Sequence, residues 1–232
     1  ANAYTSFTKT AYLFSATNNI EKNVETLLDF VQDPYFSDET VEKEKGIISQ
    51  EIKMYDDQPD WQSFMGTVKA MFKHHPVKND IAGTVDSIMP ITKEDLYTCY
   101  NTFYHPENMT LFIAGNFDEQ KMMTLIENNQ NKKDFVSMEE VRRSYPAEPT
   151  EVAMKENKIT MPISVSRCTI GIKESSTELE KYDFLKRDLL QNMTIDYYFS
   201  QAGPFYQTLY DEGLIDDSFS FSTTLEKSFG YS

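Results

Sequence analysis

Hydrophobic residues recur at helical spacing through much of the chain and alternate with polar residues in a few shorter stretches. Apolar positions three and four residues apart predict helices, and alternation predicts strands. The predicted helices are residues 18–31, 38–55, 91–104, 118–130, 179–200 and 205–211, with one more ending near residue 73. The predicted strands are residues 1–17, 109–115, 158–172 and 218–224. This order predicts an α+β fold of two related domains, each a mainly antiparallel sheet covered by helices.

Two carboxylates fall on the apolar face of the helix predicted over residues 38–55. Glu44 and Glu51 are seven residues apart, and each has Ile47 and Ile48 within three or four positions. At about 100° per residue, both side chains are expected to point inward. A buried carboxylate is costly unless it is paired or bound to a metal, so this pair is the best functional lead in the sequence.

Three roles for this pair remain open from the residues alone. The carboxylates could pair with basic or backbone donors, or they could act together as an acid and a base. The second role suits glycoside hydrolysis, but two helical turns separate the backbones by about 10.5 Å, beyond the usual carboxyl spacing. The third role is metal ligation, in which a glutamate and two histidines hold zinc. His74, His75 and His105 are weak partners, since each lies in a loop at or next to a proline.

A polar and charged stretch with two prolines separates the two halves of the chain. Such composition is typical of an interdomain linker. We therefore expect a first domain over residues 1–135, a linker over residues 136–156 and a second domain over residues 157–232.

Charge and cysteine usage narrow the class of protein. A net charge of −15 and a pI near 4.6 argue against nucleic-acid binding, which needs basic surface. No apolar run has the roughly 18–20 residues of a membrane span. Cys99 and Cys168 lie far apart without metal-type spacing, so we expect reduced thiols and a cytoplasmic protein.

Four stretches of the sequence resemble the insulinase/pitrilysin-type zinc peptidases, the inverzincins, in their processing-protease-like bacterial branch. They are NAYTSFTKTAYLF, VEKEKGIISQEIKMYDDQP, HPVKNDIAGTVDSI and ITKEDLYTCYNTFYHPENMTLFIAG, and the resemblance extends over nearly the whole chain. In this family an H-x-x-E-H helix supplies two histidine ligands and a glutamate base. A later glutamate completes the zinc site, and another glutamate precedes it by seven residues.

The resemblance implies roles for particular residues. Glu51 matches the last zinc ligand, and Glu44 matches the earlier glutamate, which supports the metal shell in the catalytic site. The substrate-binding strand of the family, to which an extended peptide adds by backbone hydrogen bonds, is matched by Asn2, Ala3, Tyr4 and Thr5.

The resemblance also implies a function for the intact parent protein, a zinc metalloendopeptidase that hydrolyses peptides in an enclosed chamber. The two histidine ligands and the glutamate base would lie before residue 1. The chain would then be the remainder of an N-terminal metal-site domain, followed by the first part of a second, homologous domain. We expect that it neither holds zinc tightly nor cleaves peptides by itself.

One departure from the family pattern bears on partners. Active members carry an arginine and a tyrosine in a pattern like LREKxGLAY, whereas this chain reads LYDEGLIDD. Tyr210 stands at the arginine position, and Asp216 stands near the tyrosine position. We therefore expect a heterodimer with a related peptidase-like subunit that supplies the missing pair, with a homodimer as the other arrangement. The alternative function is a non-catalytic structural or peptide-binding subunit, as in the family's respiratory-complex relatives.

Overall fold

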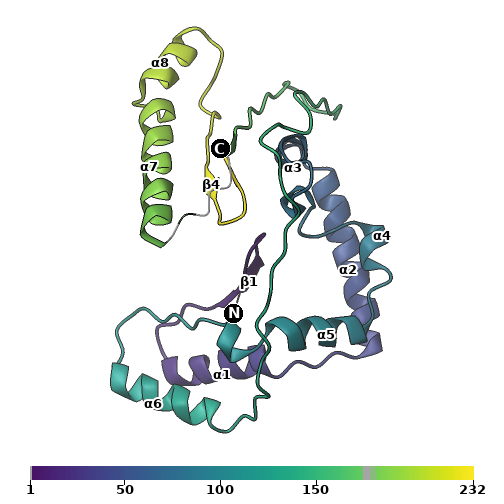
Figure 1. The fold of residues 1–232 in the computed structure, drawn as a ribbon, viewed down its shortest axis with the longest axis vertical. Coiled ribbons are helices and arrows are strands. Elements are labelled where there is room, and N and C mark those ends of the chain that lie inside the picture. Colours follow the sequence, from purple (N-terminus) through teal and green to yellow (C-terminus); the bar gives the residue numbers. More distant parts are fainter. Residues whose placement is uncertain (1, 175–178, 180) are drawn as a thin grey trace. The chain divides into compact units, whose positions relative to one another are not determined.

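The computed structural model describes residues 2–174, 179 and 181–232 (Figure 1). Contacts between residues divide the chain into two units. The first unit comprises Ala1–Met54 and Ile81–Arg143, and the second comprises Tyr55–Asp80 and Ser144–Ser232. The second unit therefore contains a segment that lies, in sequence, between the two parts of the first. The predicted division into domains at residues 136–156 stays a prediction.

The first unit contains a hairpin and most of the helices. Its elements are β1 (Asn2–Thr5), β2 (Thr10–Leu13), α1 (Ile20–Gln32), α2 (Asp38–Asp56, whose last residues belong to the second unit), α4 (Val85–Ile88), α5 (Lys93–Phe103), the 3-10 helix η2 (Pro106–Asn108) and α6 (Glu119–Gln130). The second unit contains α3 (Pro59–Met71), the 3-10 helix η1 (Pro76–Lys78), β3 (Lys173–Glu174), α7 (Lys181–Phe199), α8 (Pro204–Asp211), β4 (Thr224–Leu225) and β5 (Gly230–Tyr231).

The longer helices lie where the apolar spacing predicts them, and side chains at their starts explain why. Thr92 precedes α5 and accepts a hydrogen bond from the backbone N–H of Asp95, whose carboxylate accepts one from the N–H of Thr92. This reciprocal pair satisfies two N–H groups that the helix leaves free. Asp118 likewise accepts from the N–H of Lys121 at the start of α6. α1, α3 and α8 begin without a side-chain cap, and at α1 the preceding Asn19 adopts a left-handed conformation with φ of 52°.

The predicted strands differ more from the structure. Where one strand is predicted over residues 1–17, residues 2–13 form a hairpin of two four-residue strands. Residues 109–115 and 158–172 form no strand at all, and only Thr224–Leu225 remains of the strand predicted near residue 220. Phe112 is 84% exposed, so the stretch 109–115 is not buried as the core strand of a sheet would be. A strand exists only in a ladder with a partner, and alternation along a sequence does not specify that partner.

The coarse prediction of a mixed helix and sheet fold is confirmed, since helices accompany two small sheets among the described residues. β1 pairs with β2, and β5 lies between β3 and β4, all in antiparallel register. A larger sheet covered by helices in each domain stays a prediction. No helix in the described part of the chain combines the length and apolar character needed to cross a membrane.

Helix α3 supplies the core of the second unit. Its buried side chains and those just after it are Met65, Val68, Met71 and Phe72. The ring of Phe72 lies 6.3 Å, centroid to centroid, from both Phe229 and Tyr231, which flank or belong to β5. Aromatic contacts of this kind stabilise beyond the area that they bury. The C-terminal residues of the second unit therefore pack on a helix that precedes them by more than 150 residues.

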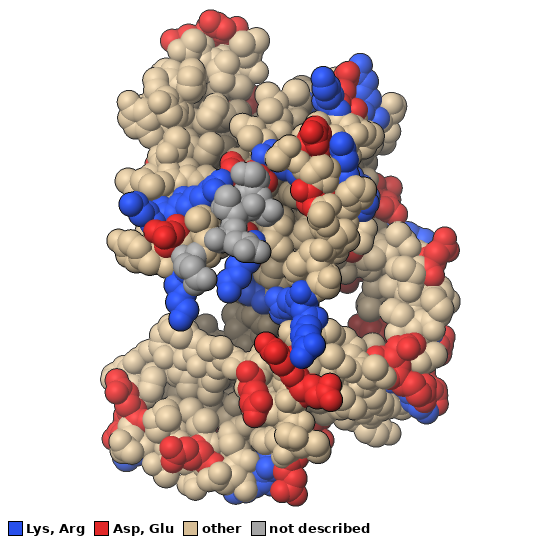
Figure 2. Space-filling view, in the orientation of Figure 1, with Lys and Arg blue, Asp and Glu red and all other residues tan. Residues whose placement is uncertain are grey.

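The first unit is held together by smaller contacts. Val24 of α1, Val41 of α2 and Met122 of α6 are buried. The hydroxyl groups of Tyr12 and Tyr104 lie 2.9 Å apart and link β2 to the end of α5. Burial of Tyr12, together with this hydrogen bond, raises the pKa of its phenol well above the ordinary value. On the face shown in Figure 2, acidic side chains are spread over both units and interspersed with basic ones.

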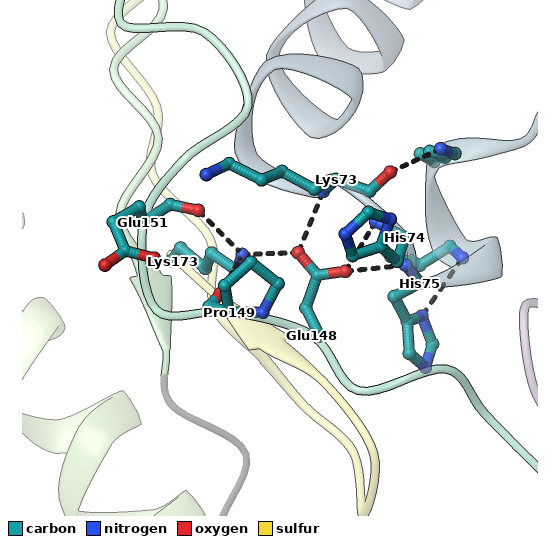
Figure 3. Close-up of polar contacts among 9 residues, drawn as sticks. Lys73, His74, His75, Glu148, Pro149, Glu151 and Lys173 are labelled. Atoms are coloured by element: carbon teal, nitrogen blue, oxygen red, sulfur yellow. Dashed lines mark hydrogen bonds and ion pairs between the residues drawn. The ribbon is translucent and has the colours of Figure 1, made fainter.

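A buried carboxylate joins the start of the C-terminal part of the second unit to the turn that follows α3 (Figure 3). Glu148 accepts hydrogen bonds from the backbone N–H groups of Lys73, His74 and His75 at 2.8, 2.7 and 2.6 Å. It also forms an ion pair at 2.5 Å with Lys173, the first residue of β3. The side chains of this pair are only 8% and 5% exposed.

The ammonium group of Lys173 is equally well satisfied. It donates to the backbone oxygens of Pro149 and Glu151 at 2.6 and 3.4 Å and lies 5.1 Å from the centroid of the Phe72 ring. Burial alone would raise the pKa of Glu148, but the hydrogen bonds from Lys173 and the three N–H groups outweigh it and lower the pKa to about 2. We call Glu148, Lys173 and the backbone of residues 73–75 the Glu148 clasp.

We predict that Glu148→Gln destabilises the second unit by about 3–5 kcal/mol at pH 7, the usual cost of removing one partner of a buried ion pair. Urea unfolding followed by the fluorescence of Trp61, the single tryptophan and a residue of this unit, measures the effect. The folded-state pKa lies below the ordinary value of 4.5, so the stabilisation is complete above pH 4.5 and lost as the pH falls towards 2.

The control for this prediction is Glu156→Gln, which removes an exposed partner of Lys158 in the same unit. Exposed ion pairs contribute about 0–1 kcal/mol, so the control should unfold nearly as the parent does. Equal stabilities for the two variants would contradict the role assigned to the clasp, as would a difference that grew on acidification.

Candidate active site

The outer edge of β1 is open for pairing. In the hairpin, the N–H of Ser6 donates to the oxygen of Lys9 at 2.8 Å, and Ala3 and Tyr12 lie opposite each other. Bonded and non-bonded pairs alternate along an antiparallel ladder, so the backbone groups of Ala3 and Thr5 point away from β2. The N–H of Ala3 accordingly donates to its neighbour's side-chain oxygen, Oδ1 of Asn2, at 2.9 Å.

All four residues of this strand are exposed: Asn2, Ala3, Tyr4 and Thr5. β2 is the only strand that pairs with β1 within the part of the chain that the structure describes. An extended peptide could therefore add to β1 by backbone hydrogen bonds, with the side chain of Asn2 as the group it would displace.

Glu44 and Glu51 lie on α2, as the sequence predicts, but the expectation that they point into a core is wrong. Both residues are exposed. α2 buries only Val41 and Ile52, which are eleven residues apart and lie on one narrow line. At about 100° per residue, the two glutamates lie roughly 70–90° around the helix from that line.

Apolar neighbours of the glutamates share this exposure. Ile47 is 49% exposed and Met54 is 51% exposed, so the apolar side of α2 extends well beyond the line that the structure buries. Spacing along a helix predicts which residues share a face, and only packing decides how much of that face is covered. Glu44 and Glu51 thus share one accessible face of α2, two turns apart and bordered by apolar side chains.

Two of the three histidines, His75 and His105, use their ring nitrogens to bond neighbouring loops. His75 and His105 each precede a proline at the start of a 3-10 helix, and each Nδ1 accepts a hydrogen bond from the backbone N–H two residues later. The remaining nitrogen of His75 lies 3.2 Å from the Ser228 hydroxyl, and that of His105 lies 2.9 Å from the oxygen of Val136. Since Nδ1 accepts, Nε2 carries the proton in the neutral ring.

Burial lowers the pKa of His75 and thereby favours the neutral ring that this arrangement needs. Within the described residues there is no group of three His, Cys, Asp or Glu side chains that could hold a metal ion. The residues described here therefore do not by themselves fit a zinc site, although the carboxylate of Glu51 is a suitable zinc ligand.

The two residues at the departure from the family pattern have local partners. Tyr210 lies on α8 and stacks on Tyr206, with ring centroids 5.9 Å apart. Asp216 accepts hydrogen bonds from the backbone N–H and the hydroxyl of Ser218 in the turn that follows, and these bonds lower its pKa. The structure does not bring either residue together with Glu44 or Glu51 in one described unit.

Comparison with known proteins agrees with the resemblance seen in the sequence. Residues 1–85 match the family described as Insulinase (Peptidase family M16), and residues 90–232 match the one described as Peptidase M16 inactive domain. A Bacillus subtilis protein named "Uncharacterized zinc protease YmfH" is 49% identical over 231 residues, which are 100% of this chain and 54% of that protein.

Two further similarities concern a solved structure and a more distant relative. The crystal structure of an M16-like peptidase from Alicyclobacillus acidocaldarius has a TM-score of 0.92 and 44% identity, and the match covers 99% of this chain and 54% of that one. Subunit 1 of the mitochondrial cytochrome b-c1 complex of Mus musculus is 29% identical over 125 residues, which are 53% of this chain and 26% of the subunit.

The chain thus spans about half the length of its Bacillus subtilis relative. The second family match alone covers well over half of the chain, and the two matches together leave only residues 86–89 unassigned. The chain belongs to the insulinase family of peptidases.

Proposed function

We propose that this chain is part of a zinc-dependent endopeptidase that hydrolyses peptides in an enclosed chamber. The observation that carries the proposal is the 49% identity, over the whole chain, to a Bacillus subtilis protein named as a zinc protease. The similarity to an M16-like peptidase of known structure supports it. The relatives are about twice as long as this chain, so the proposal concerns the full-length protein.

Glu51 is proposed as a zinc ligand and Glu44 as the residue that positions the metal shell. What supports these roles is the placement of both carboxylates on one accessible face of α2, seven residues apart. Zinc, when bound in such a site, activates water for attack on a peptide carbonyl. The other ligands and the base are proposed to come from residues outside this chain, since the described residues contain no complete metal-binding group.

The hairpin is proposed as the substrate-binding edge. Ala3 and Thr5 direct their backbone groups away from β2, and all of β1 is exposed. A peptide added there would be held in an extended conformation by main-chain hydrogen bonds, which do not depend on its side chains. Such binding suits an endopeptidase that accepts many sequences.

A second candidate function is a non-catalytic structural or peptide-binding subunit. The relative named as a subunit of the cytochrome b-c1 complex favours it, because that protein is part of a larger assembly. The description of the match over residues 90–232 as an inactive domain is also consistent with it. The presence of both Glu44 and Glu51 favours the peptidase.

For either function, we propose a related peptidase-like subunit as partner, in a heterodimer rather than a homodimer. The support comes from two residues: Tyr210 stands where active relatives have the arginine, and Asp216 stands near the position of their tyrosine. Both residues are engaged in local contacts. Co-expression with related chains, followed by size-exclusion chromatography, tests this. A homodimer with full peptidase activity would overturn it.

In the full-length protein, we predict that Glu51→Gln abolishes stoichiometric zinc and peptide cleavage, because an amide is a much poorer ligand than a carboxylate. Glu44→Gln should weaken zinc binding by about 10–100-fold, as loss of an outer-shell partner does. Elemental analysis after dialysis and cleavage of a quenched fluorescent peptide measure the two effects. Glu39→Gln, an exposed glutamate on the same helix, is the control and should leave both unchanged.

The metal readout separates the two candidate functions. Full zinc occupancy in Glu51→Gln would remove Glu51 from the ligand set. A full-length parent that contains neither zinc nor peptidase activity would favour the non-catalytic subunit.

We also predict that Ala3→Pro in the full-length protein raises KM for extended peptides roughly 3–10-fold with little change in kcat, since it removes one outward hydrogen-bond donor. Proline is tolerated on an edge strand where its missing N–H faces away from the ladder, so the hairpin itself should persist. Ala3→Thr keeps the N–H and is the matched control. The same KM in both variants would rule out peptide addition at this edge.

A further inference from the structure

Two arginines lie in an exposed, irregular stretch of the chain. Arg142 and Arg143 are both exposed, and residues 134–149 adopt neither helix nor strand. Within residues 137–144, only Met138 and Val141 are partly covered. No hydrogen bond or ion pair is formed by residues 137–144 within the part of the chain that the structure describes.

Each end of this stretch is fixed by a His-Pro turn. On the upstream side, the rings of His105 and Phe135 lie with their centroids 5.9 Å apart. Nε2 of His105 also forms a hydrogen bond with the backbone oxygen of Val136. On the downstream side, His75 stacks on Tyr145 with ring centroids 4.8 Å apart. Pro146 then restricts Tyr145 to an extended conformation. The stretch from 137 to 144 is thus an accessible span between two anchored ends, which is the kind of segment that proteases cleave.

Lys155 and Lys158 lie in another irregular segment, and they are exposed, but contacts with a helix tether their backbone. This segment runs along α3, where the N–H of Met154 donates to the oxygen of Ala70 at 2.8 Å. Asn157 donates to the oxygen of Gly66, and the Ile159 side chain lies over that glycine. Cleavage needs several consecutive residues free to enter an active site, and these contacts hold that segment in place.

The pair Lys132 and Lys133 follows the end of α6 in a closed turn. Their backbone N–H groups donate to the oxygens of Asn129 and Gln130. Lys133 also forms an ion pair with Asp29 at 2.8 Å. This second basic pair is therefore held in a compact, hydrogen-bonded conformation, unlike Arg142 and Arg143.

We propose that the peptide bonds after Arg142 and Arg143 form a processing site for a protease that cleaves after arginine, and that the nicked chain stays associated. Cleavage adds one water molecule across a peptide bond. After Arg143, the C–N bond breaks, the carbonyl carbon becomes the carboxylate of Arg143 and the nitrogen becomes the α-amino group of Ser144.

Association of the two products follows from the make-up of the second unit. The product 1–143 contains Tyr55–Asp80, and the product 144–232 contains the rest of that unit. The core contacts of Phe72 with Phe229 and Tyr231 join the two products, and so does the Glu148 clasp. The new amino terminus at Ser144 is next to the anchored Tyr145, so cleavage frees little of the downstream product.

Limited digestion of the chain with trypsin tests the proposal, with intact-mass measurement of the first products. We expect fragments ending at Arg142 or Arg143, which co-elute at the volume of the uncut chain in size-exclusion chromatography. In the double variant Arg142→Gln/Arg143→Gln, the first cleavage should slow by at least about tenfold, because the remaining sites need local opening. Lys155→Gln/Lys158→Gln is the matched control and should be cut as fast as the parent.

Three results would overturn the proposal. The first cut could fall at another basic residue, or the arginine double variant could be cut as fast as the parent. Separation of the two products in buffer without denaturant would overturn the association. In the nicked protein, Glu148→Gln should lower the urea concentration at which the products separate, and an unchanged concentration would exclude the clasp from holding them together.

Discussion

The second unit depends on a carboxylate that is almost completely removed from water and fully bonded. Glu148 binds three consecutive backbone N–H groups in the turn that follows α3 and the ammonium group of Lys173 at the start of β3. A buried charge without such partners would cost several kcal/mol. Glu148 can therefore be buried only when the segments that carry its partners are packed around it. The clasp therefore joins three parts of the sequence that are otherwise distant.

The aromatic core next to the clasp explains why these parts stay together. Phe72 packs against Phe229 and Tyr231, and Lys173 lies over its ring. As a result, the contacts of α3 place it in the second unit together with the C-terminal residues. The family match that contains α3, however, ends at residue 85. The boundary between two family matches and the boundary between two packed units are thus different properties of this chain.

The candidate active site differs from the clasp, because its residues are accessible to solvent rather than buried. Glu44 and Glu51 share an exposed face of α2, and β1 presents an open edge in the same unit. Both features leave polar groups available for a metal, a peptide or a further part of the protein. The two His-Pro turns have the opposite role, because each uses both ring nitrogens to fix a neighbouring loop.

The sequence by itself determined the helices, because apolar spacing and capping residues such as Thr92 and Asp118 act within a few residues of each other. It also determined the family and the presence of Glu44 and Glu51 on one side of α2. The sequence did not determine which strands pair, because alternation does not identify the partner that a ladder needs. Residues 109–115 and 158–172, which are predicted as strands but form none, are the examples. Glu148 was equally invisible, since a lone glutamate between prolines carries no local signal. Only the tertiary structure decided which carboxylate is buried, Glu148 rather than Glu44 or Glu51, because burial depends on what distant segments place around a side chain.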